Sequence, residues 1–100
     1  MPKLLDPIKP GDILKDDFMA DYGLSANKLA RDIDVPTNRI LGIINGTRAV
    51  TADTALRLGR YFGTGPELWM NLQASYDLEI AKREIEPSIK RRIRPIGKAA

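Results

Sequence analysis

The chain contains no cysteine and no histidine among its 100 residues. The absence of cysteine excludes disulfides and thiolate metal sites, and it fits a reducing compartment. The absence of histidine removes the commonest metal ligand and the side chain that most readily exchanges protons near neutral pH. Because carboxylates, lysines and hydroxyls remain, catalysis is disfavoured rather than excluded. We expect a protein that is not an enzyme, with no catalytic residues, no metal site and no cofactor.

Long apolar runs are also absent. No stretch approaches the roughly 20 apolar residues that a membrane-spanning helix needs. Residues 1–12, MPKLLDPIKPGD, contain neither a long apolar segment nor a small-residue cleavage site, so they do not resemble a signal peptide. The length suits one small domain with a modest core. We therefore expect a cytoplasmic protein with no membrane partner.

The charges are distributed unevenly although the net charge is only +3. Residues 25–61 hold six basic and three acidic side chains, and residues 88–100 hold five basic and no acidic ones. The two remaining segments, residues 1–24 and 62–87, each carry an excess of acidic side chains. Positive charge gathered in two segments is typical of a protein that binds a polyanion.

The pattern of apolar positions, caps and breakers predicts an all-α domain. Ser25 and Thr51 are candidate N-caps, Pro36 breaks the chain between two helices, and Asn45-Gly46 is a typical helix exit. No run alternates with the period of a strand. We predict a domain over residues 1–86 and a basic, mobile tail over residues 87–100. The predicted helices span residues 10–21, 26–33, 37–44, 52–62 and 66–85.

Residues 25–48, SANKLARDIDVPTNRILGIINGTR, predict two short helices joined by a tight turn. This layout is typical of a helix-turn-helix, whose second helix enters the DNA major groove. Thr37, Asn38 and Arg39 open that second helix. Asn pairs with adenine, Arg pairs with guanine, and a Thr methyl packs on a thymine methyl. We predict that these three side chains contact bases; the alternative is an ordinary polar face on a surface helix.

Phosphate contacts are expected from side chains around the same two helices. Hydroxyls, amides, basic groups and the free backbone N–H groups at a helix start all bind phosphate oxygens. The alternative for each of them is simple solvation. The candidates are Ser25, Asn27, Lys28, Asn45, Thr47, Arg48 and Thr51.

The last predicted helix is long for so small a domain. Trp69, Met70, Tyr76 and Leu78 point to more than one side of it, so one apolar face is predicted to stay uncovered in a monomer. An uncovered apolar face favours a homodimer, and two-fold symmetry matches a palindromic site on double-stranded DNA. The alternative is that these four residues only complete the core.

Four blocks of sequence resemble the HigA antitoxins, a branch of the XRE family of phage-repressor-like regulators that includes virulence-associated protein I. The blocks are IKPGDIL (8–14), GLSANKLARDIDVP (23–36), INGTRAVTADTALRLGRYFGT (44–64) and PELWMNLQASYDL (66–78). The resemblance implies a five-helix, lambda-repressor-like fold. It also implies a dimer that binds a palindromic operator in its own promoter and neutralises a RelE/HigB-like toxin that cleaves mRNA.

The chain departs from the family pattern at three positions. Relatives often carry histidine where this chain has Lys9, and glutamine where it has Ala26, so a phosphate contact from that glutamine is missing. Phage repressors often carry glycine at the position of Asp34, and Asp can adopt the same left-handed conformation at some cost.

Two charged segments have no role in the helix-turn-helix. Asp12, Asp16 and Asp17 belong to an acidic set on the first predicted helix, and we speculate that they bind the basic surface of an RNA-cleaving toxin. The basic tail would repel such a toxin, so contact with the DNA backbone is the functional alternative to plain solvation. A stand-alone regulator without a toxin remains the competing function.

Overall fold

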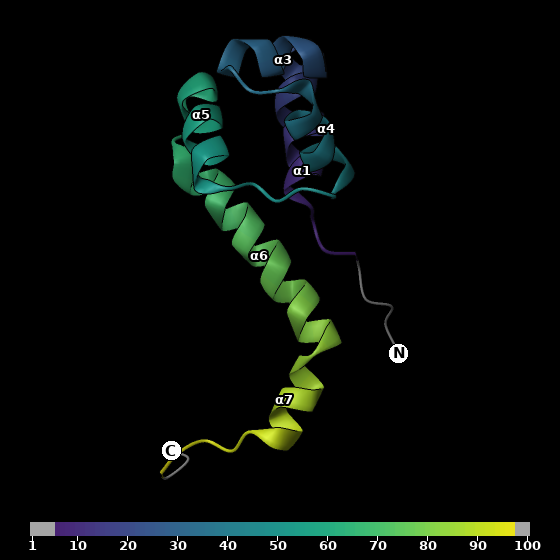
Figure 1. The fold of residues 1–100 in the computed structure, drawn as a ribbon, viewed down its shortest axis with the longest axis vertical. Coiled ribbons are helices and arrows are strands. Elements are labelled where there is room, and N and C mark those ends of the chain that lie inside the picture. Colours follow the sequence, from purple (N-terminus) through teal and green to yellow (C-terminus); the bar gives the residue numbers. More distant parts are fainter. Residues whose placement is uncertain (1–5, 98–100) are drawn as a thin grey trace.

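The computed structural model describes residues 6–97 of the chain (Figure 1). The first five and last three residues, Lys98 of the predicted tail among them, lie outside this range. All regular elements within it are helical. In chain order they are α1 (Pro10–Ile13), η1 (Leu14–Met19), α2 (Ala20–Tyr22), α3 (Ala26–Ile33), α4 (Thr37–Asn45), α5 (Ala52–Phe62), α6 (Pro66–Glu84) and α7 (Glu86–Arg92). The predicted all-α fold is therefore confirmed, and α3 and α5 have the predicted bounds.

The first predicted helix is one continuous segment whose middle, η1, is a π-helix. The N–H of Ala20 donates to the carbonyl of Lys15, five residues earlier. Leu14 and Met19 are both buried, yet five residues on an α-helix turn the chain by about 500°, which leaves them about 140° apart. The wider π turn brings both side chains toward the core. The apolar pattern of the sequence predicts an unbroken α-helix here and does not reveal the π turn.

The turn between α3 and α4 has the geometry that its sequence predicts. Ser25 caps α3, because its Oγ accepts from the N–H of Lys28 at 3.0 Å. Asp34 takes the left-handed conformation at φ 61° and ψ 51°, and the N–H of Val35 then donates to the carbonyl of Ala30 at 2.9 Å. Pro36 precedes α4 in an extended conformation. These contacts close one helix and start the next within three residues.

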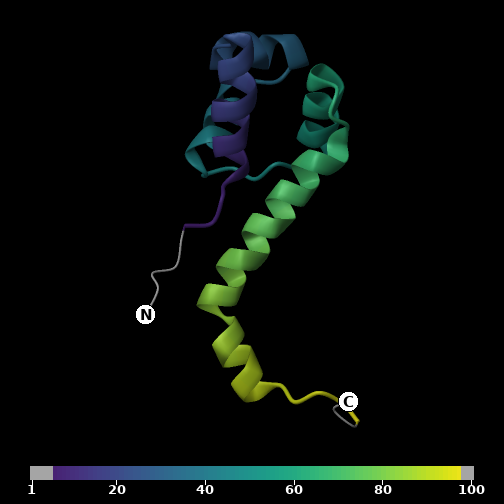
Figure 2. The ribbon, with the colours of Figure 1, turned by 180° about the vertical axis from the view of Figure 1, so that it is seen from behind.

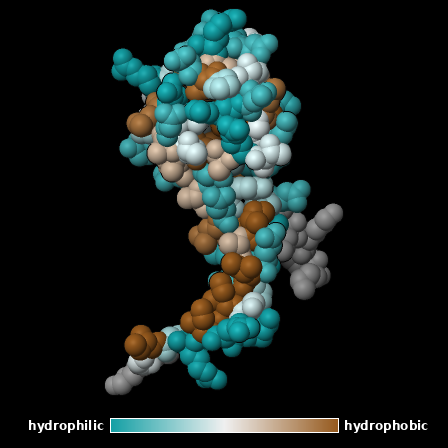
Figure 3. Space-filling model, viewed as in Figure 1, coloured by the Kyte–Doolittle hydropathy of each residue, from teal (hydrophilic) through white to brown (hydrophobic). Residues whose placement is uncertain are grey.

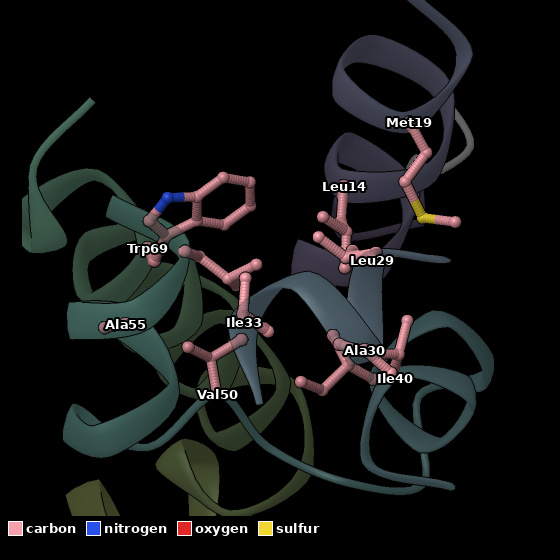
Figure 4. Packing of buried hydrophobic residues seen from close by; sticks show 11 residues of the cluster. Leu14, Met19, Leu29, Ala30, Ile33, Ile40, Val50, Ala55 and Trp69 are labelled. Carbon is pink, nitrogen blue, oxygen red and sulfur yellow. The ribbon is translucent and has the colours of Figure 1, made fainter. Parts of the chain in front are cut away.

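The core lies where α1 to α6 meet, and Figure 4 shows its side chains converging from different helices. Trp69, Leu14, Leu29 and Ile40 are fully buried. Phe18 packs on the Trp69 ring with centroids 5.0 Å apart, so the π-helical segment and α6 meet through aromatic contacts. This packing holds α3 and α4 in place from behind.

Two glycines allow helices to approach closely. A Cβ at Gly11 would overlap the carbonyl oxygen of Ile43, so α1 begins against the backbone of α4. A Cβ at Gly59 would overlap the backbone of Gly65, where α5 turns into α6. Any larger residue at either position would push apart elements that carry the helix-turn-helix or support it.

The later part of α6 and α7 extend away from this core (Figures 1 and 2). Only Trp69 and Gln73 of α6 are buried, and no described residue after Gln73 is. Residues 86–92, which were largely assigned to a mobile tail, instead form α7 at the far end of α6 from α3 and α4. Pro87 is tolerated in the first turn of that helix, where its missing N–H costs nothing.

Candidate nucleic-acid interface

The exposed face of α4 is centred on Asn38, Leu41 and Asn45. Each residue of an α-helix turns by about 100°, so these three share one side, opposite the buried Ile40 and Ile43. Asn38 and Asn45 form no side-chain hydrogen bond within the described part of the chain. Leu41 is 42% exposed, although the sequence analysis gave it no role. An apolar side chain between two amides is suited to contact a thymine methyl.

The three predicted base-contacting residues do not lie on one face. Thr37 and Arg39 precede and follow Asn38, so they lie on opposite flanks of the exposed face. Thr37 is half-buried, and its side chain has no hydrogen-bond partner within residues 6–97. Arg39 turns toward α5, where its Nη1 donates to Oδ2 of Asp53 at 2.8 Å. Asn38 is therefore the member of the three that is freely presented.

Asp53 at the start of α5 binds a second arginine with the same oxygen. Arg57 donates from Nε to Oδ2 of Asp53 at 3.1 Å, and from Nη1 to the carbonyls of Ile33 at 2.9 Å and Asp34 at 3.2 Å. The hydrogen bond from Arg57, followed by the one from Arg39, lowers the pKa of Asp53 below its usual value. One carboxylate thus links the starts of α4 and α5, and Arg57 extends the link to the end of α3.

The residues predicted to contact phosphates lie at the start of α3, at the end of α4 and in the segment that leads to α5. Ser25 and Thr51 are both N-caps that accept backbone N–H groups, and their hydroxyls can still donate. Arg48 has no side-chain partner within residues 6–97, whereas the Oγ1 of Thr47 donates to the carbonyl of Gly42 at 3.4 Å. Asn27, like Asn45, is exposed without a side-chain hydrogen bond in the described structure.

Lys28 is less available than its position suggests. Its Nζ lies 2.9 Å from Oδ1 of Asp32, one turn along α3. The hydroxyl of Tyr61 donates to the other oxygen of Asp32 at 2.6 Å. This bond, with a smaller contribution from Lys28, lowers the pKa of Asp32, and the same contact raises the pKa of Tyr61. A phosphate would have to compete with Asp32 for the Lys28 ammonium.

The loop between α4 and α5 is fixed from behind by a buried amide on α6. Gln73 accepts from the backbone N–H of Val50 at 2.7 Å through Oε1 and donates to Asp77 at 2.9 Å through Nε2. Val50 is buried, so water cannot reach its backbone N–H. The hydrogen bond to Gln73 satisfies that N–H instead. This hydrogen bond was not predicted from the sequence. The clue in the sequence is that Gln73 lies four residues after Trp69, on the same side of α6 as that buried ring.

The other predicted site residues lie elsewhere. Trp69 is 0% exposed and donates to Oγ1 of Thr64 at 3.0 Å, so its assignment to a dimer interface is wrong: its ring fills the core of its own chain. Met70 and Leu78 are exposed, and Tyr76 is half-buried. Asp16 and Asp17 are exposed on η1, and Asp12 is half-buried on α1. Within the described range no three acidic side chains converge as metal ligands would.

A capped helix, a left-handed turn and a second helix with an exposed polar face together define a helix-turn-helix. A helix-turn-helix family model matches residues 18–69. Virulence-associated protein I of Dichelobacter nodosus is 46% identical over 77 residues, which cover 77% of this chain and 71% of that protein. The chain thus belongs to the helix-turn-helix family, in its XRE branch.

Its structural neighbours are HigA-family antitoxins. An addiction module antidote protein of a HigA family from Coxiella burnetii has a TM-score of 0.86 and 45% identity, covering 91% of this chain and 99% of that one. Antitoxin HigA of Pseudomonas aeruginosa, solved with the higBA promoter, has a TM-score of 0.88 and 40% identity over the same shares. These comparisons indicate DNA-binding regulators and no enzymatic family. None of the helices in residues 6–97 has both the length and the hydropathy that a bilayer crossing requires.

Proposed function

We propose that this chain is the antitoxin of a type II toxin–antitoxin module, and that it represses its own operon as a dimer on a palindromic operator. The observation that carries the DNA contact is the exposed face of α4. The side chains of Asn38 and Asn45 lie there with no hydrogen-bond partner among residues 6–97, and Arg48 lies just beyond the end of the helix. Polar groups held ready on a rigid helix lose little entropy when they bind base edges. The similarity to an antitoxin solved with promoter DNA supports the same assignment.

The proposed dimer uses an apolar strip at the far end of the molecule. The strip consists of Leu78 on α6, Ile85 between the helices, Ile89 on α7 and Ile93 just beyond it, all exposed. Figure 3 shows this strip continuing along the C-terminal half of α6 and α7. So much exposed isoleucine and leucine is unusual on a monomer of this size. A second copy of the chain would cover the strip and bring two α4 helices into a symmetric pair.

The proposed toxin surface is separate from the DNA face. Asp16 and Asp17 are exposed on η1, with Asp12 one turn earlier, and they give this side of the domain a negative charge. A RelE/HigB-like toxin that cleaves mRNA needs a basic surface to hold its substrate, so acidic side chains can pair with it. Both functions would be exercised in the bacterial cytoplasm, at the nucleoid when DNA is bound.

A stand-alone XRE-type regulator is the competing proposal, because the helix-turn-helix and the dimer strip serve that role equally well. The two differ in gene context. A reading frame for a small basic protein next to this gene supports the antitoxin, and its absence supports the stand-alone regulator.

A titration of the protein against its own upstream DNA tests the DNA proposal. The double substitution Asn38→Ala plus Arg39→Ala is expected to weaken binding of that DNA by about 2–6 kcal/mol if both side chains contact bases, since each specific base contact contributes about 1–3 kcal/mol. Binding of random DNA is expected to weaken much less.

The matched control is Asn71→Ala on α6, which removes the same kind of exposed side chain outside the helix-turn-helix. It is expected to leave binding unchanged. An equal loss on upstream and random DNA would show that Asn38 and Arg39 contact only phosphates, which contradicts base recognition by α4.

A further inference from the structure

Arg39 is held at the edge of the DNA face by a carboxylate of its own chain. Its Nη1 lies 2.8 Å from Oδ2 of Asp53, and its side chain is 29% exposed. Asp53 would keep a partner if Arg39 left, because Arg57 binds the same oxygen. Arg57 is fixed in turn by the carbonyls of Ile33 and Asp34. Arg39 is thus the exchangeable member of the cluster, and Asp53 and Arg57 are its fixed part.

The carboxylate occupies a position that a DNA group could take. An arginine fork binds carboxylates, phosphates and the O6/N7 edge of guanine with the same donors. The cluster opens into a surface notch of about 470 Å³ between α4 and α5, and Arg48 and Thr51 line it as well. The notch therefore joins the candidate base contact to candidate phosphate contacts.

We propose that Asp53 is a specificity-determining residue, which keeps Arg39 from binding phosphates and releases it to a base edge. The proposal rests on the proposed DNA-binding function of α4. A phosphate that approached Arg39 would meet the negative charge of Asp53, and the two anions repel one another. A guanine edge is neutral and meets no such repulsion, so Asp53 penalises non-specific contact more than base contact.

The charge of Asp53 is secured by its neighbours. Two arginine donors on one oxygen stabilise the ionised carboxylate, which agrees with the lowered pKa of Asp53. The repulsion is therefore present throughout the neutral pH range. Release of Arg39 is cheap because partly exposed ion pairs are weak, so a guanine contact can replace it.

The test is the substitution Asp53→Asn, measured by salt titration on random DNA and on the upstream DNA. On random DNA the slope of log affinity against log salt is expected to steepen by about 0.9, the value of one additional phosphate contact. If the variant and the wild type bind random DNA equally at 1 M salt, this extra slope makes the variant bind about fivefold more tightly at 0.15 M. On the upstream DNA the slope is expected to stay unchanged, so the ratio of specific to random affinity falls.

Controls separate this role from a general effect of charge. Glu67→Gln removes an acidic side chain from the first turn of α6, as Asp53→Asn does for α5, and it is expected to leave both slopes unchanged. In an Arg39→Gln background, Asp53→Asn is expected to lose its effect on random DNA. Asp53→Ser is expected to steepen the slope on random DNA as Asp53→Asn does. It replaces Asp53→Asn in the test if the asparagine variant does not fold.

The outcomes are distinct. An unchanged slope on random DNA overturns the proposal, and so does a loss of upstream-DNA affinity with random binding intact, because Asp53 would then hold Arg39 in its DNA-contacting position. A wild-type protein that binds upstream and random DNA equally well would refute the proposed function itself. The inference fails while the proposed function stands when the wild type prefers the upstream DNA and the Asp53→Asn variant gives either of the two overturning results.

Discussion

The hydrogen bond from Val50 to Gln73 gives the sharpest prediction about how the fold supports the DNA face. Gln73 is 9% exposed and accepts the N–H of Val50 at 2.7 Å, which ties the loop between α4 and α5 to α6. The substitution Gln73→Leu keeps nearly the same volume and removes the acceptor. The Val50 N–H is then buried without a partner, because Val50 itself is 2% exposed.

The expected cost follows from that unsatisfied donor. A buried N–H left without an acceptor destabilises a protein by about 1–3 kcal/mol, and no cavity contributes because leucine fills the space. We expect the free energy of unfolding to fall by about 2 kcal/mol. For a domain of this size that corresponds to a Tm lower by about 8–16 °C.

Two measurements check this prediction. Urea unfolding at one fixed protein concentration gives the stability change, and hydrogen exchange at the Val50 amide reports the lost bond directly. The control is Asp77→Ala, which removes the partner of the other end of the Gln73 amide and leaves the Val50 bond intact. It is expected to change stability much less. A Gln73→Leu variant as stable as the wild type, with a protected Val50 amide, would refute the reasoning.

Two further predictions concern the partners. Ile89→Lys places a charge in the apolar strip, and a two-fold dimer contains the substitution in both copies. At about 1.5–3 kcal/mol for each copy, the dimer is expected to weaken by about 3–6 kcal/mol. Sedimentation of the Ile89→Lys protein should then show a monomer. Leu56→Lys changes an exposed leucine outside the strip and should leave the dimer intact. A dimeric Ile89→Lys protein would exclude the strip as the interface. The double reversal Asp16→Lys plus Asp17→Lys is expected to weaken binding of the proposed toxin partner without changing binding of the upstream DNA. Unchanged toxin affinity in a calorimetric titration would remove η1 from the toxin surface.

Much of the helix-turn-helix could be predicted because its signals are local. A cap such as Ser25 satisfies a backbone group three residues away, and Pro36 and Asn45-Gly46 restrict the backbone at their own positions. The bounds of α3 and α5 coincide with such local signals, the caps Ser25 and Thr51 among them, and they agree with the prediction. The left-handed conformation of Asp34 was expected from the resemblance instead, because phage repressors often carry glycine at this position.

The features that were missed depend on contacts between distant parts of the chain. The π turn in η1 follows from the need to bury Leu14 and Met19 together, and nothing in the local sequence favours it. The pairing of Arg39 with Asp53 joins residues fourteen apart, and the Gln73 bond joins residues twenty-three apart. Trp69 was misassigned because apolar periodicity does not distinguish the core of one chain from an interface between two.

The long helix α6 connects the domain that carries the proposed DNA face to the proposed dimer strip. It therefore relates DNA binding to dimerisation. At its start, Trp69 and Gln73 hold the core and the loop that precedes α5. At its end, the apolar strip begins with Leu78 and continues onto α7. Nineteen residues of helix extend about 28 Å, and they bend less readily than a loop. A second copy bound at the strip would therefore hold its α4 at a defined distance from the first, which is what recognition of two half-sites requires.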